Sequence, residues 1–260
     1  MASDSIDPAP SAAAFRRGLV LPLVLLAAWE VGSHSGLVNP QFLPPLEKVG
    51  QVAWQELRNG ELTFALATSL KRDLLGFALG SGVGIVIGLL LGLSSVADRI
   101  FTTWFNGLKQ IALLAWIPLI SLWFGFDETA KIVFIGLAAA IPVILNTVEG
   151  VRATSTRLLE VGDIFKFNRL QFVWSIYLPS ATPSLLTGLH LGLIYAWLAT
   201  IGAEYFMAAG PGIGGLIISG RERFEMALVL LGIVVVGLVG FCVDRGASWL
   251  ERRLVSWRTV

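Results

Sequence analysis

Long apolar stretches separated by short charged segments constrain this chain more than any other feature. The hydrocarbon core of a bilayer is about 30 Å thick and needs about 20 apolar residues per helix. Five stretches near this length lie between charged residues: Leu74–Ala97, Gln110–Phe126, Ile132–Val148, Leu170–Ala203 and Met226–Val243. Because 55% of the 260 residues are apolar and only 14% are charged, a soluble domain is excluded. We expect an all-α polytopic membrane protein.

A sixth apolar stretch, Gly18–Trp29, follows Arg16 and Arg17. It is short enough to be the apolar region of a cleaved secretory signal. The apolar character resumes beyond Glu30, however, and no small-x-small cleavage site follows at the expected place. This pattern favours a retained helix, so we predict six transmembrane helices, the first over residues 16–38.

The distribution of Lys and Arg predicts the orientation. With the N-terminus inside, eleven of these residues fall in inner segments and seven in outer ones, and cytoplasmic loops carry such an excess. The predicted organisation is a cytoplasmic N-terminal tail (1–15), a periplasmic segment and elbow (39–73), a core (74–260), a cytoplasmic insert within it (149–179) and a cytoplasmic C-terminal tail (244–260).

Several classes of function are not supported. A net charge of +1 without a basic run argues against nucleic acid as a partner. Cys242 stands alone in the last apolar stretch, and neither His34 nor His190 has a Cys or carboxylate at ligand spacing, so we expect no metal site. No Gly-Lys dipeptide occurs, which excludes a P-loop. If nucleotide drives this protein, another chain hydrolyses it.

Glycine recurs every four residues in the second apolar stretch, at Gly76, Gly80, Gly84, Gly88 and Gly92. Residues at this spacing lie on one slowly winding stripe of a helix. Such a stripe lets another helix approach closely, which is a main source of helix association in lipid. We expect packing within one subunit; the alternatives are a dimer seam and a moving gate. Gly232, Gly237 and Gly240 suggest similar approaches later in the chain.

Polar side chains near the apolar stretches are costly in hydrocarbon, about 2.5 to 3.5 kcal/mol each at mid-depth. The candidates for facing a water-filled translocation path are Arg72, Trp116, His190, Glu204 and Arg221. Two of these have structural alternatives, since Arg72 could belong to an interfacial elbow and Glu204 could pair with Arg221 on the outer side.

Other polar and helix-breaking residues are expected to have structural roles. Lys109 is expected to anchor the third stretch at its cytoplasmic side. The glycine-rich segment Gly210–Gly220 is interpreted as a tight outer loop. Pro118, Pro142 and Pro183 each remove a helical hydrogen bond, and such breaks occur where protein or water satisfies the backbone.

The charged insert 149–179 carries two helix start signals. Ser155 or Thr156 can cap a short helix, and Asn168 with Gln171 three residues later has the form of a capping box. These signals predict two short helices that meet at a bend near Phe167. An ordinary amphipathic interfacial segment is the alternative.

The insert also resembles the cytoplasmic loop motif of ABC importer permeases, E-A-A-x3-G-x9-I-x-L-P. Glu160 occupies the acidic position, and Lys166 stands where the family has glycine. Because a side chain there disfavours positive φ, we expect the bend to shift toward Asn168. The predicted ATPase-coupling residues are Leu159, Glu160, Val161, Gly162, Lys166, Asn168, Ile176, Leu178 and Pro179.

The resemblance extends well beyond this motif and is strongest to permeases of the nitrate, taurine and aliphatic sulfonate group. The similar segments are Leu43–Leu46, Ser69–Gly76, Ile117–Lys131, Pro142–Gly150 and Trp197–Glu204. One departure is that Ile111 and Ala112 follow Lys109 and Gln110, where family members often have a proline just after the basic residue.

The resemblance implies the permease subunit of an ATP-driven importer of a small anion, in the bacterial inner membrane. Its implied partners are a second permease copy, two cytoplasmic ATP-binding subunits that hold ATP and Mg, and a periplasmic or lipid-anchored binding protein. This chain would then hold no cofactor and catalyse no reaction. The alternative is an ion-coupled secondary transporter, but the internal repeat typical of that class is not evident. A membrane-embedded enzyme lacks a defensible nucleophile and base.

Overall fold

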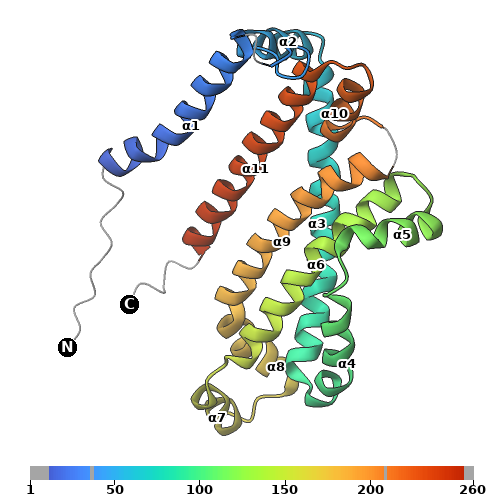
Figure 1. Cartoon of the computed structure of the whole chain (residues 1–260). Coiled ribbons are helices and arrows are strands. Elements are labelled where there is room, and N and C mark those ends of the chain that lie inside the picture. Colours follow the sequence, from blue (N-terminus) through green and yellow to red (C-terminus); the bar gives the residue numbers. More distant parts are fainter. Residues whose placement is uncertain (1–11, 36–37, 208–209, 255–260) are drawn as a thin grey trace.

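The computed structural model describes residues 12–35, 38–207 and 210–254, and every regular element in these ranges is a helix. In chain order the helices are α1 (Ala12–His34), α2 (Leu46–Arg58), α3 (Glu61–Leu93), α4 (Ser95–Leu108), η1 (Leu113–Trp116), α5 (Ile117–Phe124), α6 (Glu128–Arg152), α7 (Thr156–Ile164), α8 (Arg169–Phe172), η2 (Val173–Tyr177), α9 (Leu178–Phe206), α10 (Ile213–Glu222) and α11 (Met226–Leu254). They form an elongated bundle with α2 and α10 at one end and α7 and α8 at the other (Figure 1).

Within the described ranges, four helical segments are long and apolar enough to cross a membrane: α3, α6, the continuous run through α8, η2 and α9, and α11. Two predicted boundaries change. The helix α3 begins at Glu61, so Arg72 lies inside it and not in a preceding elbow. The helix α11 continues to Leu254, so residues 244–254 extend the last span and do not form a separate tail. Residues 1–11 and 255–260 of the predicted tails lie outside the described residues.

The remaining two predicted spans are shorter. The helix α1 contains a short apolar segment, Val20–His34, and leans away from the other helices (Figure 1). Its end is tied to the start of α2, because the Trp29 indole Nε1 donates to the Pro44 carbonyl at 2.9 Å and the Leu46 N–H donates to Glu30 at 3.1 Å.

The third predicted span is not the continuous helix expected over Gln110–Phe126. Helix α4 ends at Leu108, residues 109–112 are non-helical, and η1 and α5 then contribute four and eight residues. Twelve helical residues rise only about 18 Å, too little for a bilayer core. Lys109 therefore lies between two helical segments, and its predicted position at the start of the span was wrong.

The glycine stripe of α3 packs against α6 of the same chain. A Cβ at Gly88 would lie 2.5 Å from the Thr147 Cβ, and one at Gly92 would lie 2.8 Å from the Val151 Cβ. Packing within one subunit thus explains the stripe. Gly237 differs from the expectation, since a Cβ there would meet nothing within 4 Å.

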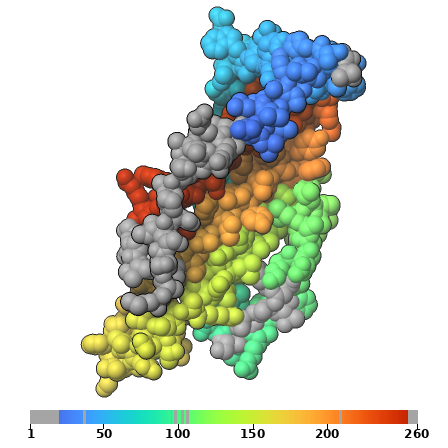
Figure 2. Space-filling view, turned by 60° about the vertical axis from the view of Figure 1, so that its left-hand side comes forward, coloured from blue at the N-terminus to red at the C-terminus, as the bar shows by residue number. Residues whose placement is uncertain are grey.

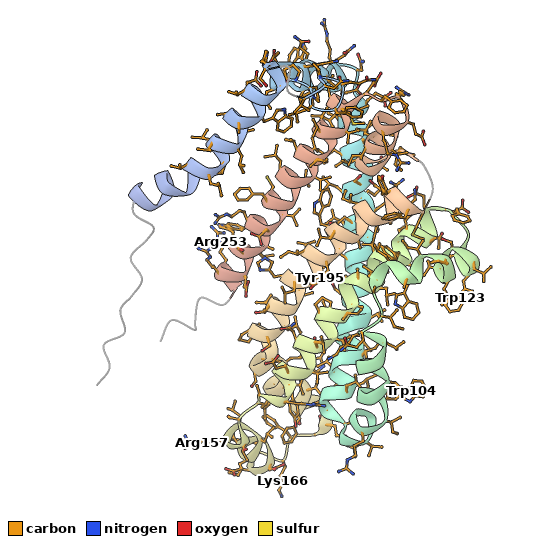
Figure 3. All side chains as sticks on the ribbon, viewed as in Figure 1. Trp104, Trp123, Arg157, Lys166, Tyr195 and Arg253 are labelled. Carbon is orange, nitrogen blue, oxygen red and sulfur yellow. The ribbon has the colours of Figure 1, made fainter. Side chains whose placement is uncertain are left out.

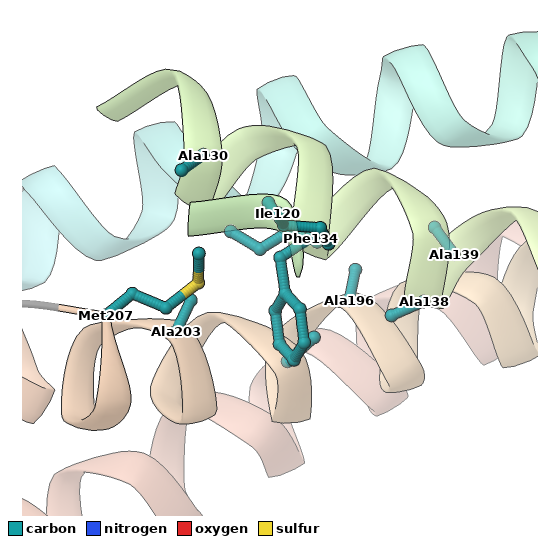
Figure 4. Close-up of a cluster of buried hydrophobic side chains, with 10 residues drawn as sticks. Ile120, Ala130, Phe134, Ala138, Ala139, Ala196, Ala203 and Met207 are labelled. Atoms are coloured by element: carbon teal, nitrogen blue, oxygen red, sulfur yellow. The ribbon is translucent and has the colours of Figure 1, made fainter. Parts of the chain in front are cut away.

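The largest buried apolar cluster lies where α5, α6 and α9 meet (Figure 4). Phe134 of α6 is fully buried among small residues such as Ala139 and Ala196. The small side chains bring α6 and α9 together, and Trp116 packs on the edge of the cluster. The three helices therefore pack against one another between the two ends of the bundle.

Candidate functional site

The loop between α6 and α9 is a packed unit built around Gly162. This glycine is buried, and a Cβ there would lie 2.6 Å from the Phe172 Cε1 atom and 2.7 Å from the Ile176 Cδ1 atom. Helix α7 therefore lies directly against the α8–η2 segment. Ile176 is buried beneath it, while Leu178 and Pro179 form the first turn of α9.

The bend of this loop lies at Lys166, which adopts a φ of 51°. Its N–H donates to the Asp163 carbonyl at 3.0 Å, and the Phe167 N–H donates to the Gly162 carbonyl at 3.0 Å. These two bonds form a Schellman motif, in which the Lys166 position normally favours glycine. The expected shift of the bend to Asn168 was wrong, because the motif holds lysine in the left-handed conformation.

Asn168 instead opens the next helix. Its side chain accepts from the Gln171 N–H and its own N–H donates to the Gln171 side chain, both at 2.8 Å. The predicted capping box is thus confirmed. Ser155 is the N-cap residue of α7, but its hydroxyl makes no capping hydrogen bond.

Large apolar side chains point outward from α7. Ile164 is 76% exposed and Phe165 is 69% exposed, and Leu158 and Val161 are exposed as well. Glu160 lies among them on the same helix and is also exposed. Arg157 and Lys166 mark this end of the molecule in Figure 3. The loop tip therefore presents an apolar surface with interspersed charges, away from the bundle.

A polar cluster, which we call the Arg72 cluster, lies toward the opposite end; Ser69, Arg72 and Glu204 are buried in it, and the exposed Glu128 lies at its edge. Arg72 donates from Nη1 to Glu204 at 2.7 Å and makes two bonds to the Glu128 carboxylate. The Ser69 hydroxyl donates to Glu204 at 2.7 Å. Arg72 and Glu204 are each 2% exposed, and pairing makes their burial possible.

Glycines allow the segment after α9 to close over the Arg72 cluster. A Cβ at Gly214 would lie 2.6 Å from the Glu204 Cβ, and Gly212 has a φ of 152°. The Gly214 N–H donates to Glu204 at 2.9 Å, and Arg72 donates to the Pro211 carbonyl at 2.6 Å. The predicted loop Gly210–Gly220 was too long, because α10 begins at Ile213.

Of the predicted translocation-path residues, the structure brings together Arg72 and Glu204 and places Trp116, His190 and Arg221 elsewhere. The alternative in which Glu204 pairs with Arg221 is wrong, since Glu204 pairs with Arg72, and Arg221 donates to the Tyr205 hydroxyl at 2.7 Å. His190 lies between two carboxylates of α11, 2.9 Å from Asp244 and 3.1 Å from Glu251. Trp116 is partly buried and packs against the apolar cluster of α5, α6 and α9.

Three of the partner carboxylates escaped sequence reasoning: Glu128, Asp244 and Glu251. Glu128 is the first residue of a span, and the other two lie beyond the last apolar stretch. Whether these carboxylates lie beside Arg72 or His190 depends on which helices pack together in the folded protein. The one available signal was that a basic residue within a span needs an acidic partner, and that acidic residues stand near the ends of other spans.

A second correction concerns metal ligands. Glu30, His34 and Glu47 bring their ligand atoms within 4.8 Å of one another at the α1–α2 corner, so a carboxylate does accompany His34. His34 lies 3.4 Å from Glu30 and 3.3 Å from Glu47, and ion pairing explains the group. Hydrogen bonding from its own backbone, and then from Glu30 and His34, lowers the pKa of Glu47.

Comparison with known proteins identifies the family. Residues 81–256 match the family described as "Binding-protein-dependent transport system inner membrane component". The chain belongs to this family. It is therefore a permease, and its apolar helices are those of a multi-pass inner membrane protein.

Several relatives align with almost the whole length of this permease. It is 36% identical to SsuC of Bacillus subtilis, named for aliphatic sulfonates transport, over 93% of this chain and 87% of that one. It is 34% identical to the taurine transport permease TauC of Escherichia coli, over 90% and 86%. It is 31% identical to the bicarbonate transport permease CmpB of Synechococcus elongatus, over 90% and 89%.

Two solved structures share the fold of the permease at low sequence identity. One, titled an amino acid ABC transporter with histidines, has a TM-score of 0.64 at 15% identity, covering 78% of this chain and 97% of that one. The other, an inward-facing MetNI methionine ABC transporter, has a TM-score of 0.58 at 20% identity, covering 72% and 94%.

Proposed function

We propose that this permease lines the path of an ATP-driven importer for a small anion, and that the 149–179 loop docks on a cytoplasmic ATP-binding subunit. The exposed apolar surface of α7 carries the proposal, because Ile164 and Phe165 would be poorly placed in water unless a partner covered them. The loop is also well suited to transmit movement, since Gly162 and Ile176 hold it in one conformation.

In the proposed assembly, two copies of the permease form the path with six spans each, and two ATP-binding subunits hold ATP and Mg. A periplasmic or lipid-anchored protein delivers the substrate. Both termini of the permease are cytoplasmic. Glu160 and its neighbours transmit the closure of the ATP-binding subunits and take no part in hydrolysis.

The anion class is supported by the relatives, whose names refer to aliphatic sulfonates, taurine and bicarbonate. These compounds share a small size and a delocalised negative group. Nitrate and similar organic acids have the same character. Calorimetry on the binding protein encoded with this permease would identify its ligand.

Charge reversal at the loop tip tests the proposal. In a complex reconstituted with its ATP-binding subunits and binding protein, Glu160→Lys should abolish transport and substrate-stimulated ATP hydrolysis while the permease remains folded. Glu222→Lys makes the same charge change on the exposed end of α10 and should leave both activities intact. Unchanged stimulated hydrolysis in Glu160→Lys would refute the docking role. An ATP-binding subunit should also co-purify with the wild-type permease.

A further inference from the structure

The non-helical turn between α4 and η1 lies near the middle of the bundle. Lys109 and Gln110 in this turn line a cavity together with Pro142 and Asn146 of α6 and Tyr195 of α9. Pro142 is close to the centre of α6, Asn146 lies one turn nearer the C-terminal end of that helix, and Tyr195 is close to the centre of α9. Since both helices are long enough to span the bilayer, the turn lies near mid-depth.

The cavity is large enough for a small solute. Its volume is about 460 Å³, within the range of roughly 300–1,000 Å³ common for ligand pockets. A hollow between α6 and the green α4–α5 segment is visible in Figure 2. At membrane depth, non-helical backbone is tolerated only where protein buries it or where it lines a water-filled cavity. The turn at Lys109 thus indicates water in this space.

Polar groups of α6 and α9 face the same cavity. Pro142 has no N–H, so the carbonyl of Ala138, which also lines the cavity, lacks its helical donor. Asn146 donates from Nδ2 to the Pro142 carbonyl at 2.9 Å, which leaves a second amide hydrogen. Tyr195 is 51% exposed and lies at the middle of the bundle in Figure 3.

Lys109 adds a positive charge to these groups. Its side chain is exposed, and among the described residues no carboxylate forms an ion pair with it. Arg72 and Lys131, by contrast, both lie beside Glu128. A lysine at this depth is unfavourable in lipid and normally faces a bundle interior or an aqueous cavity.

We infer that Lys109 is the cation that a permeating anion contacts at the middle of the translocation path, with Gln110, Asn146 and Tyr195 as neutral hydrogen-bond donors. The ligand class is a small oxyanion such as a sulfonate, which rests on the proposed function. An ammonium group suits this task because it acts as a point charge with no fixed bidentate geometry. It would accept anions of different shape and release them readily.

Water access provides a test that does not depend on transport. In a Cys242→Ser background of the assembled complex, Lys109→Cys should react with the anionic reagent 2-sulfonatoethyl methanethiosulfonate. Leu79→Cys is the matched control, because Leu79 is exposed near the middle of α3 and does not line the cavity at Lys109. It should remain unlabelled in lipid. Failure to label Lys109→Cys would overturn the inference.

Transport then tests the charge itself. With methanesulfonate, taurine and bicarbonate as probes, Lys109→Gln should lower uptake about tenfold, as expected for losing a charged hydrogen-bond donor. Binding-protein-stimulated ATP hydrolysis should stay within about twofold, since a mid-membrane side chain does not touch the coupling loop. Lys109→Arg should restore most of the uptake, and Lys48→Gln, at an exposed site on α2, should resemble wild type.

The outcomes separate the two proposals. If the wild-type complex imports none of the three probes and shows no stimulated hydrolysis, the proposed function fails. If wild type imports a probe and Lys109→Gln imports it equally well, only the role of Lys109 fails. Equal losses in Lys109→Gln and Lys109→Arg would also overturn it, since they would show that shape and not charge is required.

Discussion

Replacing Lys166 by glycine is expected to stabilise the loop that joins α7 to α8. The left-handed conformation of Lys166 costs an L-residue about 1–2 kcal/mol, and glycine avoids this cost. Glycine loses about 0.4–1 kcal/mol through the greater freedom of the unfolded chain. Removing a positive charge at the C-terminus of α7 costs roughly another 0.3–0.5 kcal/mol. The expected net stabilisation is about 0.5 kcal/mol.

The alanine variant isolates the conformational effect. Lys166→Ala loses the same charge but keeps the unfavourable φ, so Lys166→Gly should be more stable than Lys166→Ala by about 1 kcal/mol. Hydrogen exchange of the Phe167 amide measures this difference, because that amide donates to the Gly162 carbonyl across the bend. A gap of 1 kcal/mol corresponds to about fivefold in protection.

Asn168→Gly is the positional control. Asn168 has a φ of −77° and caps α8, so glycine there should lower protection. Equal protection in Lys166→Gly and Lys166→Ala, or a gain in Asn168→Gly, would refute a bend at Lys166. We also expect Lys166→Gly to retain coupled transport in the reconstituted complex.

Two further predictions concern the bundle. Gly88→Ala should lower stability by about 1–3 kcal/mol, because its Cβ would overlap Thr147. Gly82→Ala on the same helix meets nothing within 4 Å and should leave stability unchanged or raise it by up to about 1 kcal/mol, since alanine reduces the freedom of the unfolded chain. Thermal unfolding in detergent compares the two variants, and equal midpoints would contradict the packing. Glu204→Gln should cost about 2–3 kcal/mol, less than the roughly 3–5 kcal/mol typical of a broken buried ion pair, because a second carboxylate remains on Arg72. Arg221→Gln removes only an exposed contact and should change the unfolding midpoint little. A larger loss of stability in Arg221→Gln than in Glu204→Gln would refute the assignment of the buried pair.

Features encoded within one helix could be predicted from the sequence. The stripe from Gly76 to Gly92 follows helical periodicity, so its role in close packing was evident without knowing the partner helix. The Asn168–Gln171 capping box is equally local, since both of its bonds join residues three apart.

Features that depend on tertiary neighbours could not be predicted. Arg72 and Glu204 are 132 positions apart, and no periodicity relates them. The expectation that a side chain avoids positive φ also failed at Lys166, where two backbone hydrogen bonds and the packing of Gly162 override the preference of lysine for negative φ. The break at Lys109 was missed because the polar residues Lys109 and Gln110 were interpreted as the boundary of a span that began at Gln110, and not as a turn between two helical segments.

The helix that leaves the loop continues without interruption from Arg169 to Phe206. Thirty-eight residues at about 1.5 Å each make a rod of roughly 57 Å. Ile176 lies near one end of this helix and Glu204 near the other. A tilt of only about 5° at the loop would displace the far end by about 5 Å, on the scale of one helical turn. If the proposed ATP-binding subunit tilts the loop, the largest displacement of this helix would therefore occur where Glu204 meets Arg72.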